Sequence, residues 1–375
     1  MSWSTVIGQE RIKTLLKRIL QTKKVAHAFL FYGPEGIGKD ALAIEFAKAL
    51  NCSEDNIEAC GMCTHCLRMQ SFAHPNVRFV FALPVGKNEK AGDDPINVLS
   101  ESQVTEVRDQ LLLKSKDSYH QIEIAKANFI KINSVRDIKR EAAMSQNEQG
   151  KKIFIFFNAD MMNTEASNSL LKTLEEPLPN TILLLTTSKK DHLLPTIVSR
   201  CQLLQCDILT DEEIVNALIR RDAIDKVQAR LIAQLSQGSY TQARRLCSLN
   251  IIEERREIVE FLRIVLGKNK TVLIDAIDEL SSTSEKRQIQ RWLQLLQSWI
   301  RDAMLLQQVD QSPFLEDERK SMANFISKFP DAKLFNAIQT VEKAIAHIDK
   351  NVYLHLILTT MAITLRRNIM EPSPV

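Results

Sequence analysis

The segment 33–40 has the residue types and the spacing of a phosphate-binding P-loop. Glycines let such a loop turn its N–H groups toward phosphate oxygens, and the lysine adds a positive charge beside the N-terminus of the next helix. An apolar run over 29–32 and a helical pattern over 41–50 supply the strand and the helix that this motif requires. The candidate nucleotide-binding residues are Gly33, Gly36, Gly38, Lys39 and Asp40.

Asp40 departs from the P-loop pattern. A P-loop carries Ser or Thr after its lysine, and the hydroxyl of that residue holds Mg²⁺. The carboxylate of Asp40 could ligate Mg²⁺ itself, or it could repel the phosphates. Because the glycines and Lys39 remain, the sequence predicts weak or absent ATP binding at this site rather than tight binding.

A second set of groups that ATP hydrolysis requires is missing. The apolar run 152–157 is typical of a central parallel strand, which in a P-loop ATPase ends in an Asp-Glu pair. The aspartate holds Mg²⁺ and the glutamate polarises the attacking water. Phe157 and Asn158 stand at that end, and neither side chain can do this chemistry. We expect no intrinsic ATPase activity, and we expect Asp160 to cap the next helix.

Four cysteines after the P-loop helix have the spacing of metal ligands. Cys60, Cys63 and Cys66 form two successive Cys-x-x-Cys steps, and Cys52 lies upstream. Four thiolates satisfy tetrahedral Zn²⁺ and leave no position for a reacting water, so the predicted zinc is structural. His65 lies inside one of the steps, and we expect it to be a turn residue rather than a ligand.

The composition is that of an ordinary globular protein with a core in each of two or three domains. The formal net charge of +3 excludes a strongly basic chain. The longest apolar run, over 352–365, is too short to span a bilayer, which needs about 20 apolar residues. The first residues do not resemble a signal peptide, and the clustered cysteines favour a reducing compartment. These features predict a cytoplasmic protein.

The other elements follow from periodicity and turn signals. Residues 85–129 are polar and turn-rich with helical character over 98–114, and we expect a surface insertion without assigned chemistry. A short strand is expected at 130–132 and a helix over 134–145. Beyond 207 the pattern is helical. Thr210 and Glu213 form a capping box, Gly238 ends a helix, and a core stripe runs from Ile289 to Ile300.

Three further segments resemble the AAA+ subunits of bacterial replicative clamp loaders. The segment 168–177 resembles the helix after Walker B, 182–187 the sensor-1 strand, and 195–201 the SRC motif. With the P-loop and the cysteines, the resemblance covers most of the first 205 residues.

The resemblance implies an α/β fold: an AAA+ P-loop domain with a RecA-like parallel sheet and a zinc module, followed by two helical domains. The implied domains are a RecA-like domain over 1–206 with the insertion near 85–129, a helical lid over 207–249, and an all-α collar for oligomerisation over 250–375.

In that family the SRC arginine is an arginine finger that reaches the γ-phosphate of ATP bound to the neighbouring subunit. The resemblance implies this role in trans for Arg200. Active ATPases of the family also carry a sensor-2 arginine. Thr241 holds that place here, although Arg244 is close enough to leave the assignment open.

The resemblance implies a non-hydrolysing subunit of the DNA polymerase III holoenzyme. Its partners would be gamma/tau and delta subunits in a hetero-oligomer, with the sliding clamp and primed DNA reached through the complex and no membrane involved. One alternative is an active gamma/tau-type clamp-loader ATPase with a divergent Walker B. A second is a zinc-bearing nucleic-acid-binding adaptor, which would need a dense basic patch interleaved with aromatics that the sequence does not show.

Overall fold

The computed structural model describes residues 3–54, 57–86, 89–143, 150–248, 251–283, 286–308, 316–349 and 352–371. The chain divides into two compact units. The first comprises Met1–Ala217 with Gln237–Gln242, and the second comprises Leu218–Ser236 with Ala243–Val375. The division into three domains, with a lid over 207–249, stays a prediction.

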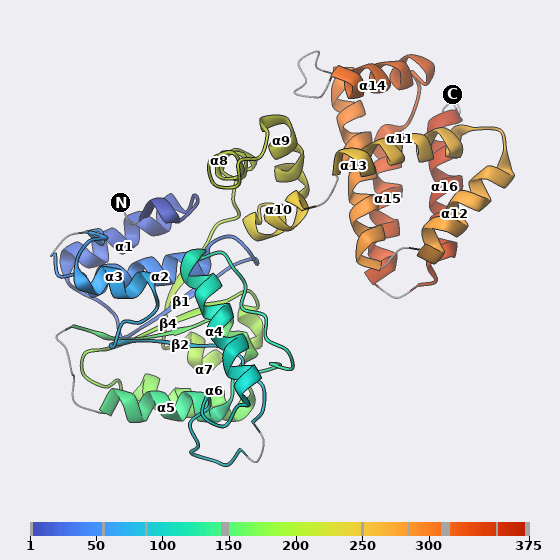
Figure 1. Ribbon diagram of the computed structural model, residues 1–375. Helices are drawn as coiled ribbons and strands as arrows, with labels where there is room; N and C mark the ends of the chain where they lie inside the picture. Colours follow the sequence, from blue (N-terminus) through green and yellow to red (C-terminus); the bar gives the residue numbers. More distant parts are fainter. Residues whose placement is uncertain are drawn as a thin grey trace. The chain divides into compact units, whose positions relative to one another are not determined.

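A parallel sheet of five strands forms the centre of the first unit (Figure 1), in the order β2-β3-β4-β1-β5. The strands are β1 (Ala28–Tyr32), β2 (Val77–Val80), β3 (Lys152–Phe156), β4 (Thr181–Thr187) and β5 (Gln202–Gln205). Strands β3 and β4 are buried along their whole length, as expected for strands covered on both faces. The sheet confirms the predicted α/β class.

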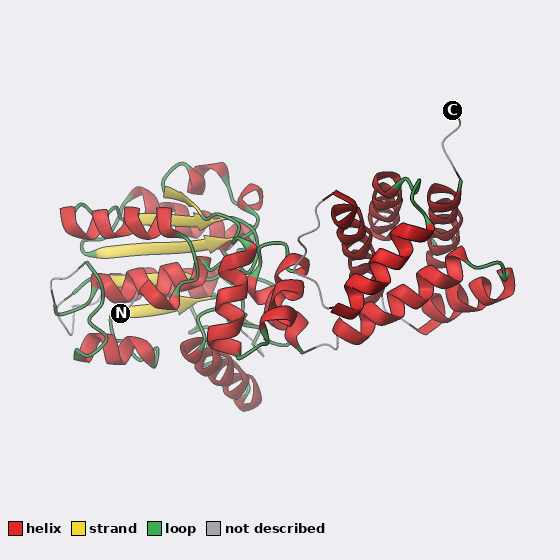
Figure 2. Ribbon diagram, turned by 90° about the horizontal axis from the view of Figure 1, so that it is seen from above, coloured by secondary structure: helices red, strands yellow, loops and turns green. Residues whose placement is uncertain are grey.

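Helices cover both faces of this sheet (Figures 1 and 2). One face carries α1 (Glu10–Thr22), α2 (Lys39–Leu50) and α3 (Thr64–Gln70), and the other carries α5 (Ile132–Ala143), α6 (Thr164–Glu175) and α7 (Pro195–Val198). Three short 3₁₀ turns are η1 (Trp3–Thr5), η2 (Ala159–Met161) and η3 (Lys190–His192). The apolar stripe of α6 packs against the buried side chains of β3 and β4.

The region around 130–145 differs in part from the sequence prediction. No strand forms at 130–132 in the described chain, where Ile130 makes an isolated bridge to Met162 and α5 already begins at Ile132. The Ile-Lys-Ile run therefore serves as the entry to a helix rather than as a strand. The predicted last residues of that helix, 144–145, lie outside the described residues.

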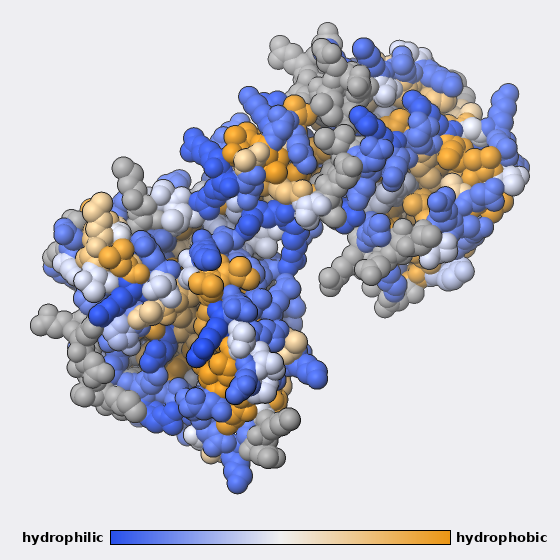
Figure 3. All heavy atoms as spheres, in the orientation of Figure 1, coloured by the Kyte–Doolittle hydropathy of each residue, from blue (hydrophilic) through white to orange (hydrophobic). Residues whose placement is uncertain are grey.

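The insertion contributes one long helix, α4 (Glu101–Lys116), which begins with a capping box formed by Ser100 and Gln103. Leu112 and Leu113 on this helix are exposed, whereas Lys114 is buried. Figure 3 shows apolar side chains gathered on the face of the first unit where α4 lies in Figure 1. A segment without helix or strand follows over 118–127.

The second unit is helical. Its helices are α9 (Lys226–Leu235), α11 (Ile251–Leu266), α12 (Lys270–Thr283), α13 (Lys286–Gln308), α14 (Glu316–Lys328), α15 (Leu334–Asp349) and α16 (Leu354–Met370), while α8 (Asp211–Asp222) and α10 (Tyr240–Cys247) contribute residues to both units. The predicted stripe from Ile289 to Ile300 is core, and the capping box of Thr210 and Glu213 forms. Among the described helices, none has the length and apolar character needed to cross a membrane.

A buried ion pair joins α11 to α13 in this unit. The guanidinium of Arg255 lies 2.6 Å from the carboxylate of Asp302, and both side chains are almost completely buried. Burial raises the pKa of the Asp302 carboxyl, and the charge of Arg255 opposes that shift. Such a pair is sensitive to the loss of either partner, because the remaining charge stays buried without compensation.

We predict that Asp302→Ala lowers the free energy of unfolding of the second unit by about 3–5 kcal/mol. Chemical denaturation followed by the fluorescence of the buried Trp292 and Trp299 measures this loss. The control is Glu253→Ala, which removes an exposed ion pair and is expected to cost less than about 1 kcal/mol. Equal losses for the two variants would show that the buried ion pair contributes no more to the free energy of unfolding than the exposed one.

Candidate functional site

The P-loop lies between the end of β1 and the start of α2, as the motif requires. Gly36 and Gly38 have φ angles of 77° and 103°, in the left-handed region that favours glycine. A Cβ atom on Gly38 would lie 2.6 Å from the phenol oxygen of Tyr119. The loop backbone and the insertion are therefore in direct contact at the N-terminus of α2.

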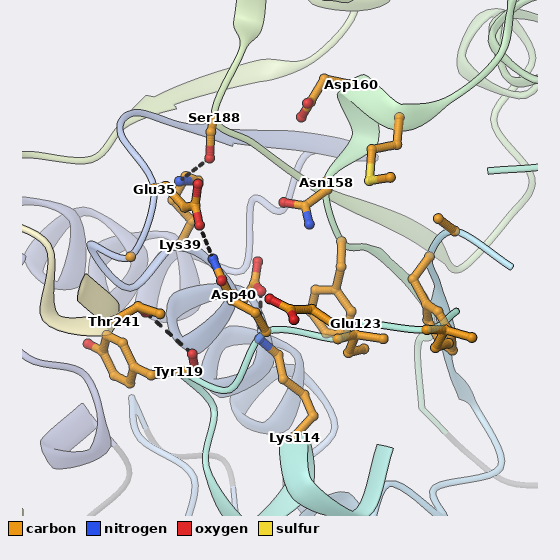
Figure 4. Close-up of a pocket in the computed structure, with 18 of the residues that line it drawn as sticks. Glu35, Lys39, Asp40, Lys114, Tyr119, Glu123, Asn158, Asp160, Ser188 and Thr241 are labelled. Carbon is orange, nitrogen blue, oxygen red and sulfur yellow. Dashed lines mark hydrogen bonds and ion pairs between the residues drawn. The ribbon is translucent and has the colours of Figure 1, made fainter. Parts of the chain in front are cut away.

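Lys39 is folded back onto its own loop. Its ammonium donates to the carbonyl of Gly33 (2.9 Å), to the carbonyl of Pro34, and to the hydroxyl of Ser188 (3.0 Å; Figure 4). These bonds use the three donors that an ammonium has. Burial lowers the pKa of Lys39, and the nearby carboxylate of Asp40 opposes that shift. A phosphate would have to compete with the loop's own oxygens for this charge.

Asp40 is held by partners from two other segments. One carboxylate oxygen lies 2.6 Å from the ammonium of Lys114, and the other accepts a hydrogen bond of 2.7 Å from the hydroxyl of Thr186 on β4. The Lys114 ammonium also donates to the carbonyl of His120 (2.6 Å) and lies 4.9 Å from the ring centroid of Phe157. The ammonium is thus placed for a cation–π contact as well as for an ion pair.

Phe157 and Asn158 stand directly after β3, at the positions where an ATPase would carry its Asp-Glu pair. Phe157 is buried and stacks on Phe79. Asp160 accepts a hydrogen bond of 2.6 Å from the Thr187 hydroxyl. The prediction that Asp160 caps the next helix is wrong: α6 is capped by Asn163, whose side chain accepts from the N–H of Ala166. The intervening 3₁₀ turn moves the cap three residues downstream.

A cavity of about 660 Å³ lies over the P-loop (Figure 4). Its walls come from the P-loop, from the insertion and from the ends of β3 and β4, and they carry both signs of charge. The labelled lining residues are Glu35, Lys39, Asp40, Lys114, Tyr119, Glu123, Asn158, Asp160, Ser188 and Thr241. Four of the five predicted nucleotide-binding residues, all but Gly33, therefore line this cavity, and the insertion shares it with them.

Thr241, to which the resemblance assigns the sensor-2 position, lines this cavity. Its hydroxyl donates to the backbone carbonyl of Tyr119 (3.4 Å; Figure 4). Arg244 follows one helical turn later and pairs with Asp222 at 3.2 Å. Of these two candidates for sensor 2, Thr241 lines the cavity with a neutral hydroxyl, and the choice between them stays a prediction.

The four predicted metal ligands come together. The sulfurs of Cys52, Cys60, Cys63 and Cys66 all lie within 4.8 Å of one another. Two of the sulfur pairs are 4.0 Å and 3.9 Å apart. A tetrahedral Zn²⁺ with Zn–S bonds of about 2.3 Å would place its sulfurs about 3.8 Å apart. The donor set therefore fits a structural zinc.

Backbone N–H groups point at these sulfurs. The N–H of Cys60 donates to Cys52, that of Cys63 to Cys60, and that of Cys66 to Cys63. Burial raises the pKa of the Cys63 thiol, but hydrogen bonds from Ser53 and Cys66 outweigh it and bring the pKa down to about 6. N–H donors of this kind favour the thiolate form that a metal binds.

His65 is turned toward another histidine. Its Nδ1 lies 2.9 Å from Nε2 of the buried His74, whose own Nδ1 accepts from the N–H of Asn76. The His74 ring therefore carries its proton on Nε2 and donates it to His65. The ring of His65 is thus engaged by His74 rather than by the cysteine cluster. The prediction of a turn residue is wrong, because His65 lies in the first turn of helix α3.

Arg200 follows α7 and precedes β5. Its guanidinium pairs with Glu175 at the end of α6 (2.9 Å) and donates to the carbonyl of Thr196 (3.0 Å). The side chain is 35% exposed. The predicted finger is thus a surface group steadied by a single exposed carboxylate.

Sequence reasoning missed the residues that the insertion brings into the site, above all Lys114 and Tyr119. One signal was present: Lys114 continues the apolar stripe of Val104, Val107 and Leu111 on one face of α4. A lysine at such a position indicates either the end of a buried face or a buried partner. Ser188 carried no recognisable pattern.

Comparison with known proteins identifies the family. The model of the family described as DNA polymerase III, delta subunit, matches residues 8–210, more than half of the chain. The chain belongs to the DNA polymerase III delta subunit family. This membership and the sheet topology together confirm the predicted AAA+ P-loop fold.

Individual relatives give the range of similarity. The DNA polymerase III subunit delta′ of Bacillus subtilis is 25% identical over 346 residues, which cover 92% of each chain. Subunit delta′ of Pseudomonas aeruginosa is 31% identical over 64% of this chain and 62% of its own length. Subunit tau of Bacillus subtilis is 28% identical over 64% of this chain and 36% of its own length.

The two relatives named delta′ support a delta-prime type of subunit within the DNA polymerase III delta subunit family. The match to tau covers a similar share of the chain at similar identity. Overall identity alone therefore does not separate the delta′ type from the tau type.

We predict one Zn²⁺ per chain in protein purified without chelator, measured by elemental mass spectrometry. Cys63→Ser should lose that metal and expose the segment around 52–70 to protease, because four thiolates are needed to close the site. Cys247→Ser is the control, since this half-buried thiol lies on α10 outside the cluster. Metal-free native protein, or equal metal loss in both variants, would contradict the zinc assignment.

Proposed function

We propose that the chain is a non-hydrolysing, delta-prime-type subunit of the bacterial DNA polymerase III clamp loader. In this role it assembles with gamma/tau and delta subunits, through a helical collar, in the cytoplasm. The complex loads the sliding clamp on primed DNA. The observation that carries the proposal is the engagement of Asp40 by Lys114 beside Phe157, where an ATPase would hold Mg²⁺.

Hydrolysis needs a hydrated Mg²⁺ on the phosphates and a group that orients the attacking water. The hydroxyl and the acid that would hold the cation are replaced by Asp40 and Phe157. The amide of Asn158 cannot accept a proton from water at neutral pH. These three replacements support the absence of turnover by the chain itself.

The chemical contribution of the chain is Arg200, supplied to ATP on a neighbouring subunit. A guanidinium that enters a neighbour's site stabilises charge on the transferring phosphoryl group without needing a nucleotide of its own. The partial exposure of Arg200 and its single weakly held carboxylate partner suit a side chain that exchanges Glu175 for phosphate oxygens.

The match to tau favours one alternative, an active ATPase with a divergent Walker B. Turnover by the purified chain with Mg²⁺ and ATP separates the two functions. The proposed function requires no turnover above background, and any turnover abolished by Lys39→Ala would establish the alternative.

We predict that Arg200→Ala lowers ATP turnover of the reconstituted loader, with clamp and primed DNA, at least about tenfold, since arginine fingers contribute about 10³-fold or more. Glu175→Ala is the matched variant, because it breaks the same ion pair and leaves the guanidinium in place. It should retain most of the turnover. Equal losses in the two variants would mean that the ion pair is structural and that Arg200 is no finger.

A further inference from the structure

Helix α4 buries a lysine in preference to two adjacent leucines. Leu112 and Leu113 are 52% and 45% exposed, whereas Lys114 is 2% exposed. Burying an ammonium is costly unless the charge is paired and hydrogen-bonded, and exposing leucines forgoes hydrophobic stabilisation. The orientation of α4 is therefore set by the partners that Lys114 finds beneath it.

These partners suit an ammonium. The carboxylate of Asp40 and the carbonyl of His120 accept two of its hydrogen bonds, both 2.6 Å long, and the ring of Phe157 faces its charge. Mg²⁺ instead requires oxygen ligands in an octahedron at about 2.0–2.1 Å, and a phenyl ring supplies none. This set of partners therefore suits the ammonium of a lysine rather than a metal ion.

The position of the ammonium matters as much as its partners. Asp40 replaces the hydroxyl that holds Mg²⁺ in a P-loop, and Phe157 replaces the acid that helps to hold it. Lys114 contacts both of these side chains. Its charge thus lies where the divalent cation of an ATPase would lie, and it would repel any such cation.

The segment after α4 makes further contacts with the P-loop. The buried phenol of Tyr119 lies against Gly38 and accepts a hydrogen bond of 2.8 Å from the N–H of Ile7. The side chain of Gln121 donates to Glu35 in the P-loop. Anions bind P-loops at the N-terminus of the following helix, and Tyr119 packs against that point.

We propose that the segment 101–127 is a resident occupant of the P-loop site. The Lys114 ammonium takes the place of the divalent cation at Asp40, and Tyr119 packs on the loop beside it. The loop then keeps its conformation with neither nucleotide nor metal, and the ammonium keeps a Mg²⁺–nucleotide complex from placing its cation at Asp40. This inference goes beyond the proposed function, and it holds whether or not Arg200 acts as a finger.

The test uses the full chain, with thermal unfolding followed in the presence of MgCl₂ and of Mg²⁺–ATP at millimolar concentration. Neither addition should shift the unfolding midpoint of the wild type. Lys114→Met should raise the unfolding constant about tenfold or more, because it leaves the Asp40 carboxylate without its cation. In this variant MgCl₂ should restore part of the loss, since the oxygens of Asp40 and Thr186 become available. Lys116→Met, at an exposed position of the same helix, is the control.

A chemical measurement on the wild type keeps the test decisive if Lys114→Met does not fold. Acetylation by a limiting amine reagent, mapped by mass spectrometry, should modify Lys116 at least tenfold faster than Lys114. A wild-type midpoint that rises with Mg²⁺–ATP, equal acetylation rates at the two lysines, or equal effects of the two substitutions would each overturn the proposal.

Discussion

The ion pair between Asp40 and Lys114 is the interaction on which the site depends. It joins residues 74 positions apart and brings together the first turn of α2, the end of α4 and the ends of β3 and β4. The Lys114 side chain is 1% exposed and that of Asp40 is 23% exposed, so the pair is only weakly screened by solvent. Next to this ion pair, the ammonium of Lys39 stabilises the P-loop by donating hydrogen bonds to the carbonyls of Gly33 and Pro34. The arrangement of a nucleotide-binding loop is thus maintained by contacts within one chain.

The two modules of the first unit share helix α2. Helix α2 begins at Lys39, the lysine of the P-loop. The cysteine cluster packs against the last turn of α2 together with Leu20 of α1. The P-loop and the cysteine cluster therefore both depend on the packing of this one helix.

Local spacing was enough to predict much of this molecule. The P-loop, the cysteine cluster, the buried strand β3 and the core stripe of α13 all follow from motifs or periodicity within a few residues, whereas strand β4 was predicted through the family resemblance. Strand β5 was not predicted, because Gln202–Gln205 is short and largely exposed. The cap of α6 was misplaced, since Asn163 competes with Asp160 and the sequence contains no rule to choose between them. Lys114 could not be assigned because its partners are distant in sequence and its burial is a tertiary effect.

The contacts of the Lys114 ammonium also limit which substitutions this site tolerates. Lys114 contacts both Asp40 and Phe157, so a substitution at any one of these three residues removes an interaction that stabilises the site. Replacing Asp40 by serine alone would leave Lys114 buried without a counter-charge, and an acid at position 157 alone would replace a ring packed against that ammonium. A metal site at this loop would thus require several substitutions made together. The folding stability of the first unit opposes the loss of either charge of the pair, whatever the chemistry of the site.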